Sequence, residues 1–215
     1  GTTTYTWTND SPAIGLAATG SGDLPSFTAI NTGTEPIVAI VEVTPLFADD
    51  INCDGISQTF TITVNPSAQV DQPQDQLLCN GDDLFVVFST QNTIGITSYS
   101  WTSDIDFGSG LNGEGNIDFT AVNNGTSPII ANITVTPSYN ENGISCVGPS
   151  QLFSITVNPA AQVDAIEDQI LCNGEDTVAI AFNTQSSGTT TYSWENDTPS
   201  IGLASSGTGD ITSFT

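Results

Sequence analysis

Apolar and polar residues alternate along several short stretches of the chain, as they do in half-buried β-strands. In 129–136, apolar residues occupy every second position and mostly polar residues stand between them. Residues 84–88 form a continuous apolar run, which predicts a buried strand and is too short to insert into a membrane. No window shows the apolar spacing of a helix. The pattern therefore predicts an all-β fold.

A Tyr-x-Trp pair is the strongest repeated signal. Residues i and i+2 of a strand point to the same face, so each pair places two large rings on one side of its strand. We expect these rings to lie in the core of a β-sandwich, whereas a solvent-facing row would indicate a platform for stacking on sugars. The pairs are Tyr5 and Trp7, Tyr99 and Trp101, and Tyr192 and Trp194.

Other landmarks recur with a period of 93 residues. Ile-Thr-Val-Asn-Pro at 62–66 returns at 155–159, and Cys-Asn-Gly at 79–81 returns at 172–174. Residues 4–28 and 191–215 share 16 identities over 25 aligned positions. Such a period fits one immunoglobulin-like β-sandwich of roughly 100 residues.

The period divides the chain into tandem units. We expect the C-terminal part of a repeat at 1–65, a complete repeat at 66–158, and the N-terminal part of a third at 159–215. This is the organisation expected of an internal piece of a much longer protein. The connectors at 65–76 and 158–169 are short and contain proline, which predicts sandwiches joined end to end into a semi-rigid rod.

The charge of the chain is entirely negative. It contains 24 acidic residues and no lysine, arginine or histidine, so its formal net charge is −24. This charge argues against nucleic acid and anionic membranes as partners. A Ser-His-Asp triad, a Cys-His pair and a Schiff base each need a residue type that is missing, so we expect no enzyme in this segment. Paired carboxylates remain as a glycosidase hypothesis, but most of the acidic residues fall in predicted turns, where a solvated surface is favoured.

The missing basic residues give a first prediction. Trypsin cleaves after lysine and arginine, and the chain has neither. Resistance to trypsin should therefore persist after full denaturation and reduction. Mass spectrometry of the denatured chain after digestion checks this result, and chymotrypsin, which has many aromatic sites here, serves as the positive control.

Cysteines occur at four positions, which indicates disulfides and an oxidising compartment. Without histidine a zinc site is not expected. One arrangement joins Cys79 to Cys146 within the complete repeat and leaves Cys53 and Cys172 for cysteines outside the chain. The other joins Cys53 to Cys79 and Cys146 to Cys172 across the connectors. We favour the first, because it closes the longer loop and makes each repeat self-sufficient.

Calcium is the one cofactor that the sequence suggests, with two candidate sites. Asp50, Asn52 and Asp54 match the opening of a calcium-binding loop, D-x-N-x-D-G. The twelfth position is Thr61 instead of a bidentate glutamate, so a solvated turn is favoured. The second set lies in the connectors: Asp71 and Asp75, with Asp164 and Asp168 one repeat later.

These motifs together resemble a known type of repeat. Tyr-x-Trp-Thr-Asn-Asp-Ser-Pro at 5–12, Ile-Gly-Leu-Ala at 14–17 and 201–204, Ile-Thr-Val-Asn-Pro and Cys-Asn-Gly-Asp are similar to the tandem PKD-like or Ig-like repeats of very large Bacteroidetes surface adhesins, among them the flavobacterial gliding-motility adhesins. The resemblance covers all three copies.

The resemblance implies a function and a location. Such adhesins are exported by the type IX secretion system, lie on the cell surface as long filaments, are moved by the gliding machinery and adhere to external surfaces or polysaccharide. Two alternatives remain open: an accessory stalk on a secreted enzyme, and a carbohydrate-binding array.

Overall fold

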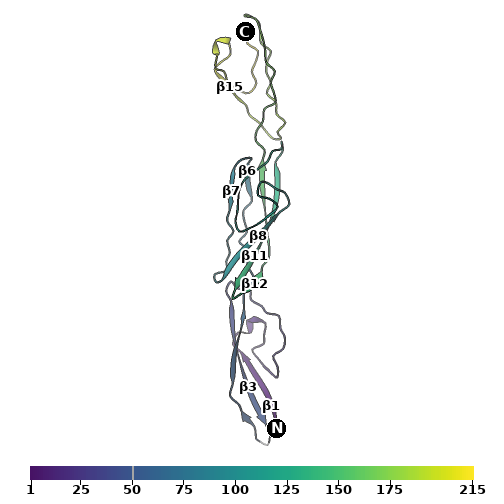
Figure 1. Ribbon diagram of the computed structural model, residues 1–215, viewed down its shortest axis with the longest axis vertical. Coiled ribbons are helices and arrows are strands. Elements are labelled where there is room, and N and C mark those ends of the chain that lie inside the picture. The colour runs from purple at the N-terminus through teal and green to yellow at the C-terminus, as the bar shows by residue number, and fades with distance from the viewer. Residues whose placement is uncertain (50) are drawn as a thin grey trace.

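The computed structural model describes residues 1–49 and 51–215. The chain is all-β, with several separate sheets and two short 3-10 helices. It is drawn out into a line with its two termini at opposite ends (Figure 1). We call residues 1–65 the N-terminal segment, 66–158 the central segment and 159–215 the C-terminal segment. None of the described helices is long and apolar enough to cross a membrane.

The N-terminal segment contains one antiparallel sheet. Its strand order is β2-β1-β3, and β5 and β4 pair in succession with the other edge of β3. The bounds of its elements are β1 (Thr2–Asn9), η1 (Pro12–Ile14), β2 (Thr19–Ser21), β3 (Ile37–Ala48), β4 (Cys53–Asp54) and β5 (Gln58–Val64).

The central segment is a two-layer β-sandwich. One layer has the order β6-β13-β11-β8-β9, with β12 also paired to β11, and the other consists of β7 and β10. All pairs are antiparallel except β6 with β13. The strands are β6 (Gln76–Cys79), β7 (Asp83–Val86), β8 (Ile96–Ser103), β9 (Asn112–Glu114), β10 (Ile117–Thr120), β11 (Ile129–Glu141), β12 (Ile144–Val147) and β13 (Gln151–Asn158).

The core between these layers is formed by the apolar side chains at every second position of the strands. Ala131, Ile133 and Val135 of β11 are fully buried against the facing layer. The prediction of a wholly buried strand at 84–88 is wrong, because only every second side chain of this run lies in the core. Leu84, Val86 and Phe88 are buried, whereas the side chains between them face solvent. A two-layer sandwich covers only one face of each sheet, so a continuous apolar run does not imply burial on both sides.

Proline lies inside the longest strand of the central segment. Pro137 has no N–H to donate, and it stands where β11 changes its partner from β13, which ends its register at Val135, to β12, which begins at Ser138. The Pro137 carbonyl still accepts a hydrogen bond from the Gly148 N–H at 3.1 Å. The sequence placed the end of this strand at Thr136, which is too early, because proline is tolerated at such a break in the ladder.

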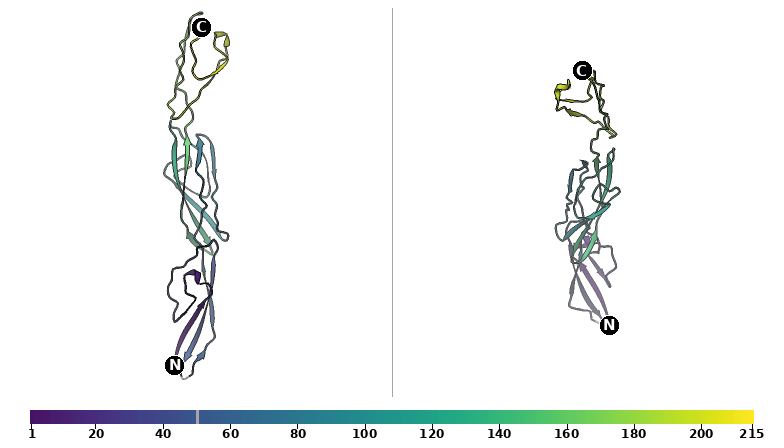
Figure 2. Two further views of the ribbon diagram at one scale, coloured as in Figure 1. Left: turned by 180° about the vertical axis from the view of Figure 1, so that it is seen from behind. Right: turned by 45° about the horizontal axis from the view of Figure 1, so that its top comes forward.

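The C-terminal segment has the least regular structure. It contains β14 (Ser193–Glu195), η2 (Pro199–Ile201) and β15 (Ser206–Thr208), and an isolated bridge joins Ile180 to Ile211. Apolar residues such as Ile170 and Val178 are exposed. Seen from behind, the segment continues the line of the other two (Figure 2).

Candidate functional site at the segment junctions

Two junctions, where one segment meets the next, share the same backbone contact. At the first, the Thr93 N–H of the central segment donates to the Thr34 carbonyl of the N-terminal segment at 3.4 Å. At the second, the Ser187 N–H of the C-terminal segment donates to the Thr126 carbonyl of the central segment, with 2.6 Å between the atoms. The repetition of this contact means that both junctions are built in the same way.

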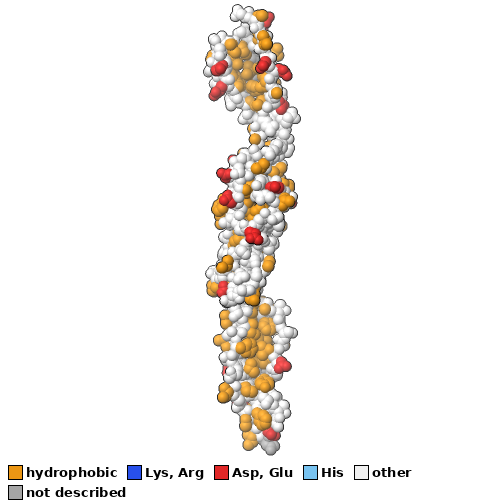
Figure 3. Space-filling model, in the orientation of Figure 1, with side chains coloured by type: hydrophobic (Ala, Val, Ile, Leu, Met, Phe, Trp, Pro, Cys, Tyr) orange, Lys and Arg blue, Asp and Glu red, His pale blue; other side chains and the backbone are white. Residues whose placement is uncertain are grey.

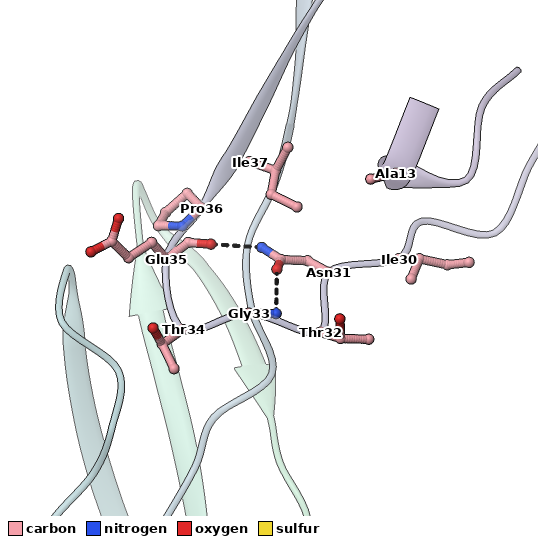
Figure 4. A pocket seen from close by; sticks show the side chains of 9 residues that line it. All are labelled: Ala13, Ile30, Asn31, Thr32, Gly33, Thr34, Glu35, Pro36 and Ile37. Carbon is pink, nitrogen blue, oxygen red and sulfur yellow. Dashed lines mark hydrogen bonds between the residues drawn. The ribbon is translucent and has the colours of Figure 1, made fainter. Parts of the chain in front are cut away.

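An asparagine shapes the turn that receives this contact at the first junction. The Asn31 side-chain amide donates to the Glu35 carbonyl and to the Val64 carbonyl, each at 2.8 Å, and its Oδ1 accepts from the Gly33 N–H at 2.9 Å. Figure 4 shows Asn31, Gly33 and Glu35 beside a pocket of about 410 Å³, with the Asn31 amide directed into the turn. The bonds fix the turn to the end of β5, so the Thr34 carbonyl faces the next segment.

The second junction repeats this turn. The buried Asn123 amide donates to the Ser127 carbonyl at 2.9 Å and to the Val157 carbonyl at 2.7 Å. Its Oδ1 accepts from the Gly125 N–H at 3.0 Å. Both turns therefore follow one pattern, Asn-x-Gly-Thr-x-Pro, at 31–36 and at 123–128.

Asn92 joins the first junction to the connector. Its amide donates to the Thr34 carbonyl at 3.5 Å and to the Ser67 carbonyl at 3.3 Å. Its Oδ1 accepts from the Gln69 N–H at 2.9 Å and from the Thr90 hydroxyl at 3.0 Å. One side chain thus holds the turn of the first segment, the connector and the second segment together.

Two further hydrogen bonds cross the first junction. The Thr93 hydroxyl donates to the Glu35 carboxylate at 2.7 Å, and the Asn65 amide donates to the Glu141 carbonyl at 3.3 Å. Because none of these contacts is an ion pair, the junction is held by uncharged and charge-assisted hydrogen bonds in spite of the uniform negative charge.

Serine replaces asparagine at the second junction. Ser186 occupies the position of Asn92, since its N–H donates to the Thr184 hydroxyl at 3.0 Å as the Asn92 N–H donates to Thr90 at 3.1 Å. The Ser186 hydroxyl is buried and has no hydrogen-bond partner among the described residues. A pocket of about 370 Å³ lies beside it, lined by Pro159, Ser187 and their neighbours. The Ser186 side chain therefore makes none of the hydrogen bonds to the described residues that Asn92 makes at the first junction.

Acidic side chains fasten the first connector to the central sandwich. The Asp71 carboxylate accepts from the Ser89 hydroxyl and the Gln91 amide, both at 2.7 Å. The Asp75 carboxylate accepts from the Ser154 N–H of β13 at 2.6 Å. Hydrogen bonds to the charged form lower the pKa of both aspartates, with Ser89 the main cause at Asp71 and the Ser154 backbone the main cause at Asp75. Among the connector acids one repeat later, Asp164 accepts from the Gln185 amide at 3.2 Å, whereas Asp168 lines a pocket of the C-terminal segment.

These lowered pKa values predict a pH-dependent effect of Asp75→Asn. The folded pKa of Asp75 lies below the usual aspartate value of about 3.9, so its contribution to stability is complete above that value and disappears as the pH falls through the folded pKa. We expect the variant to melt at a lower temperature than the wild type at neutral pH, with the difference vanishing in strong acid. Thermal unfolding from pH 7 to pH 2, followed by circular dichroism, checks this result; a difference that does not change with pH would contradict it.

Among the described residues, the calcium candidates are not gathered into a cluster of ligands. Asp50 lies outside the described residues, and Asn52 and Asp54 are exposed, Asp54 being part of β4. No group of three or more cysteine or acidic side chains suited to a metal ion occurs among the described residues. The carboxylates of Asp71 and Asp75 are occupied by the hydrogen bonds given above.

The cysteines are far apart, and all four are free in the structure. Cys79 pairs with Asn158 at one end of the central sandwich, and Cys146 pairs with Tyr139 near the other end. Val157, the neighbour of Asn158, pairs with Ile129 of β11, whereas Cys146 pairs with Tyr139 of the same strand. Ile129 and Tyr139 are ten residues apart, which corresponds to about 33 Å along the strand. A disulfide needs Cα atoms within about 7 Å, so the structure does not support the favoured Cys79–Cys146 pair, and it forms neither cross-connector bond of Cys53 or Cys172.

The four free cysteines predict the number of thiols that a chemical titration should detect. Titration of the chain, unfolded without reductant, should give four reactive thiols per chain. Treatment with reductant should leave the melting temperature unchanged. A count of two thiols, together with a melting temperature that falls on reduction, would restore the disulfide hypothesis.

The Tyr-x-Trp pairs divide by segment. Trp7 and Trp101 are buried. Tyr99 packs against the core of the central segment, whereas Tyr5 is exposed. Tyr192 and Trp194 are half-buried. The tryptophans of the N-terminal and central segments thus face inward, as expected of core residues.

Sequence reasoning missed the residues of the junctions. The repeated Asn-x-Gly-Thr-x-Pro pattern was a signal that could have identified the turns, but nothing near Asn92 distinguishes it from other polar residues. No protein-family model matches the chain, and no curated protein matches it. The junction geometry is therefore the main observation on which a functional proposal can rest.

Proposed function

We propose that this chain is a repeat segment of a very large extracellular adhesin filament on a cell surface, with a mechanical role in gliding motility. Its units are tandem immunoglobulin-like, PKD-like β-sandwich repeats of about 93 residues, as the sequence period indicates. On the resemblance of its repeat motifs, we propose the flavobacterial gliding-motility adhesin SprB as the type of parent protein. No catalytic role is proposed for this segment.

The single observation that supports this proposal most strongly is the repeated junction. Segments that meet end to end through the same turn and the same backbone contact extend the chain with each copy, as the line of segments in Figure 1 illustrates. In β3 and β11 the backbone runs almost the full length of a segment, so pulling force passes along strands that are hydrogen-bonded on both edges. A long spacer that transmits force needs both features.

Charge and burial support the choice of partners. A net charge of −24 opposes folding back of one segment on another and opposes binding to nucleic acid or anionic membrane. The partners of this proposal are the type IX secretion and gliding machinery at the cell surface, and external surfaces or polysaccharide. Burial of Trp7 and Trp101 weighs against a row of rings for sugar stacking in this segment.

Small-angle scattering tests the mechanical proposal directly. Chains that contain increasing numbers of the repeat should show a maximum dimension that grows nearly in proportion to repeat number. A compact shape with broad contacts between repeats would contradict the filament.

Antibodies against this chain separate the adhesin from the enzyme stalk. On intact gliding cells they should label filaments that move along the cell surface. Label that co-purifies only with a released hydrolytic activity would favour the stalk of a secreted enzyme.

A further inference from the structure

Two exposed apolar side chains lie on the outer face of the smaller layer of the central sandwich. On and just after β7, Leu84, Val86 and Phe88 face the core, so the residues between them point away from it. These are Phe85, which is 61% exposed, and Val87, which is 60% exposed. Alternate residues of a strand lie on the same face, so the two side chains are neighbours. We call Phe85 and Val87 the β7 patch.

The fold does not require large apolar side chains at these two positions. In the C-terminal segment Phe182 corresponds to Phe88, since each ring packs against the tyrosine of the Tyr-x-Trp pair, with 5.4 Å and 5.5 Å between the ring centroids. Counting back three and one positions gives Ala179 and Ala181 in the C-terminal segment but the two members of the β7 patch in the central segment. An exposed apolar patch that folding does not need is typical of an interaction site.

Two carboxylates flank Phe85 on this outer face. Asp118 of β10 lies directly opposite Phe85 in the antiparallel register, so their Cβ atoms are about 5 Å apart on the same face. Asp83 precedes Phe85 by two residues, and its carboxylate accepts from the Thr120 hydroxyl at 2.7 Å. Both aspartates are exposed, so their charges are available to a partner.

A third carboxylate lies at the other end of the β7 patch. Ser89 follows Val87 by two positions, and its hydroxyl donates to the Asp71 carboxylate of the connector at 2.7 Å. In Figure 3, acidic and hydrophobic side chains lie side by side on the central segment at the height where Figure 1 labels β7. The patch is therefore an apolar surface between negative charges.

We propose that this face binds a segment of another protein in which arginine stands beside apolar residues. The arginine side chain lies on the Phe85 ring and donates hydrogen bonds to the Asp118 carboxylate, which a planar guanidinium can do at the same time. An apolar neighbour of that arginine then packs on Val87. The occupant is not a second copy, because the chain contains no arginine or lysine. This interaction goes beyond the mechanical role proposed above and does not depend on it.

The surroundings of the β7 patch argue against other kinds of partner. An acidic protein or a nucleic acid is repelled by the net charge of −24. An uncharged apolar segment would remove water from the Asp118 carboxylate without giving it a partner, which is costly. A basic segment without apolar residues would leave the patch in water. A segment with both kinds of side chain uses the carboxylates and the patch together.

Titration with two synthetic peptides, followed by NMR of the full chain, tests the proposal. One is a short peptide in which arginine alternates with leucine, and the other has the same length and charge with serine in place of leucine. The arginine–leucine peptide should shift the amide signals of β7 and β10 and should bind ~10-fold more tightly, because its leucine side chains are removed from water on the patch.

Variants of the patch separate this contact from general attraction to the acidic chain. Phe85→Ala combined with Val87→Ala introduces the side chains that the C-terminal segment has at these positions, and it should weaken binding of the arginine–leucine peptide by ~10-fold. Asp118→Asn should weaken it by ~5-fold and reduce its dependence on salt. Leu152→Ala is the matched control, because Leu152 is 66% exposed on β13 of the other layer, and it should bind like the wild type.

Hydrogen exchange of the β11 amides should be the same in all variants, which shows that the central sandwich is intact. Equal binding of the two peptides, with signal shifts spread over acidic residues of all three segments, would mean attraction by charge alone and would overturn the proposal. A double alanine variant that binds like the wild type, or a Leu152→Ala variant that is weakened as much as the double variant, would also overturn it.

Discussion

Replacing Trp101 by alanine should lower the free energy of unfolding of the central sandwich by about 3–5 kcal/mol. Trp101 is 6% exposed on β8, where it lies opposite Val135 of β11 and Gly113 of β9. Its indole N–H has no hydrogen-bond partner among the described residues, so the loss comes from packing and from the cavity left behind. Since folded domains are stable by about 5–15 kcal/mol, this one change removes a large part of the total.

Hydrogen exchange of the β11 amides measures this loss separately from the other segments. Gly113→Ala tests the same contact from the other side, because a Cβ at Gly113 would overlap Cζ2 of the Trp101 ring. We expect it to destabilise the sandwich although the tryptophan is retained. Phe85→Ala is the control, with an expected change within about 0.5 kcal/mol. Equal effects of the Trp101 and Phe85 variants would show that the Tyr-x-Trp strand does not form the core.

The sequence predicted the strands well because their signal is local. Alternation located most of β11, and the Tyr-x-Trp spacing located β8 and the inward direction of Trp101. The errors arise where the outcome depends on partners distant in sequence. The extension of β11 past Pro137 requires the change of partner from β13 to β12, which no local pattern contains.

The candidate site was harder to predict than the fold. The cysteine spacing gives loop length but not direction, and antiparallel strands carry Cys79 and Cys146 to opposite ends of one sandwich. The calcium hypothesis likewise rested on spacing alone. Asn92 gave no signal because its importance comes from the Thr34 carbonyl, 58 residues away in the chain.

Replacing Asn92 by serine should make the first junction more flexible, and replacing Ser186 by asparagine should make the second junction stiffer. Asn92→Ser removes the amide that joins Thr34, Ser67 and Gln69, so the N-terminal segment should move more freely relative to the central one. Ser186→Asn should do the reverse at the second junction. There the pocket of about 370 Å³ beside Ser186 has room for the longer side chain, and the Thr126 carbonyl stands where Thr34 stands at the first junction.

Residual dipolar couplings measure this stiffness without labels, since rigidly joined segments share one alignment and mobile ones do not. We expect the N-terminal and central segments to share their alignment in the wild type and to lose it in Asn92→Ser. The C-terminal segment should align more closely with the central one in Ser186→Asn. Asn112→Ser makes the same chemical change on exposed β9, away from both junctions, and should alter neither alignment. If all three variants behaved alike, Asn92 would not control the joint, and the stiffness of the rod would have to come from the proline-containing connectors alone.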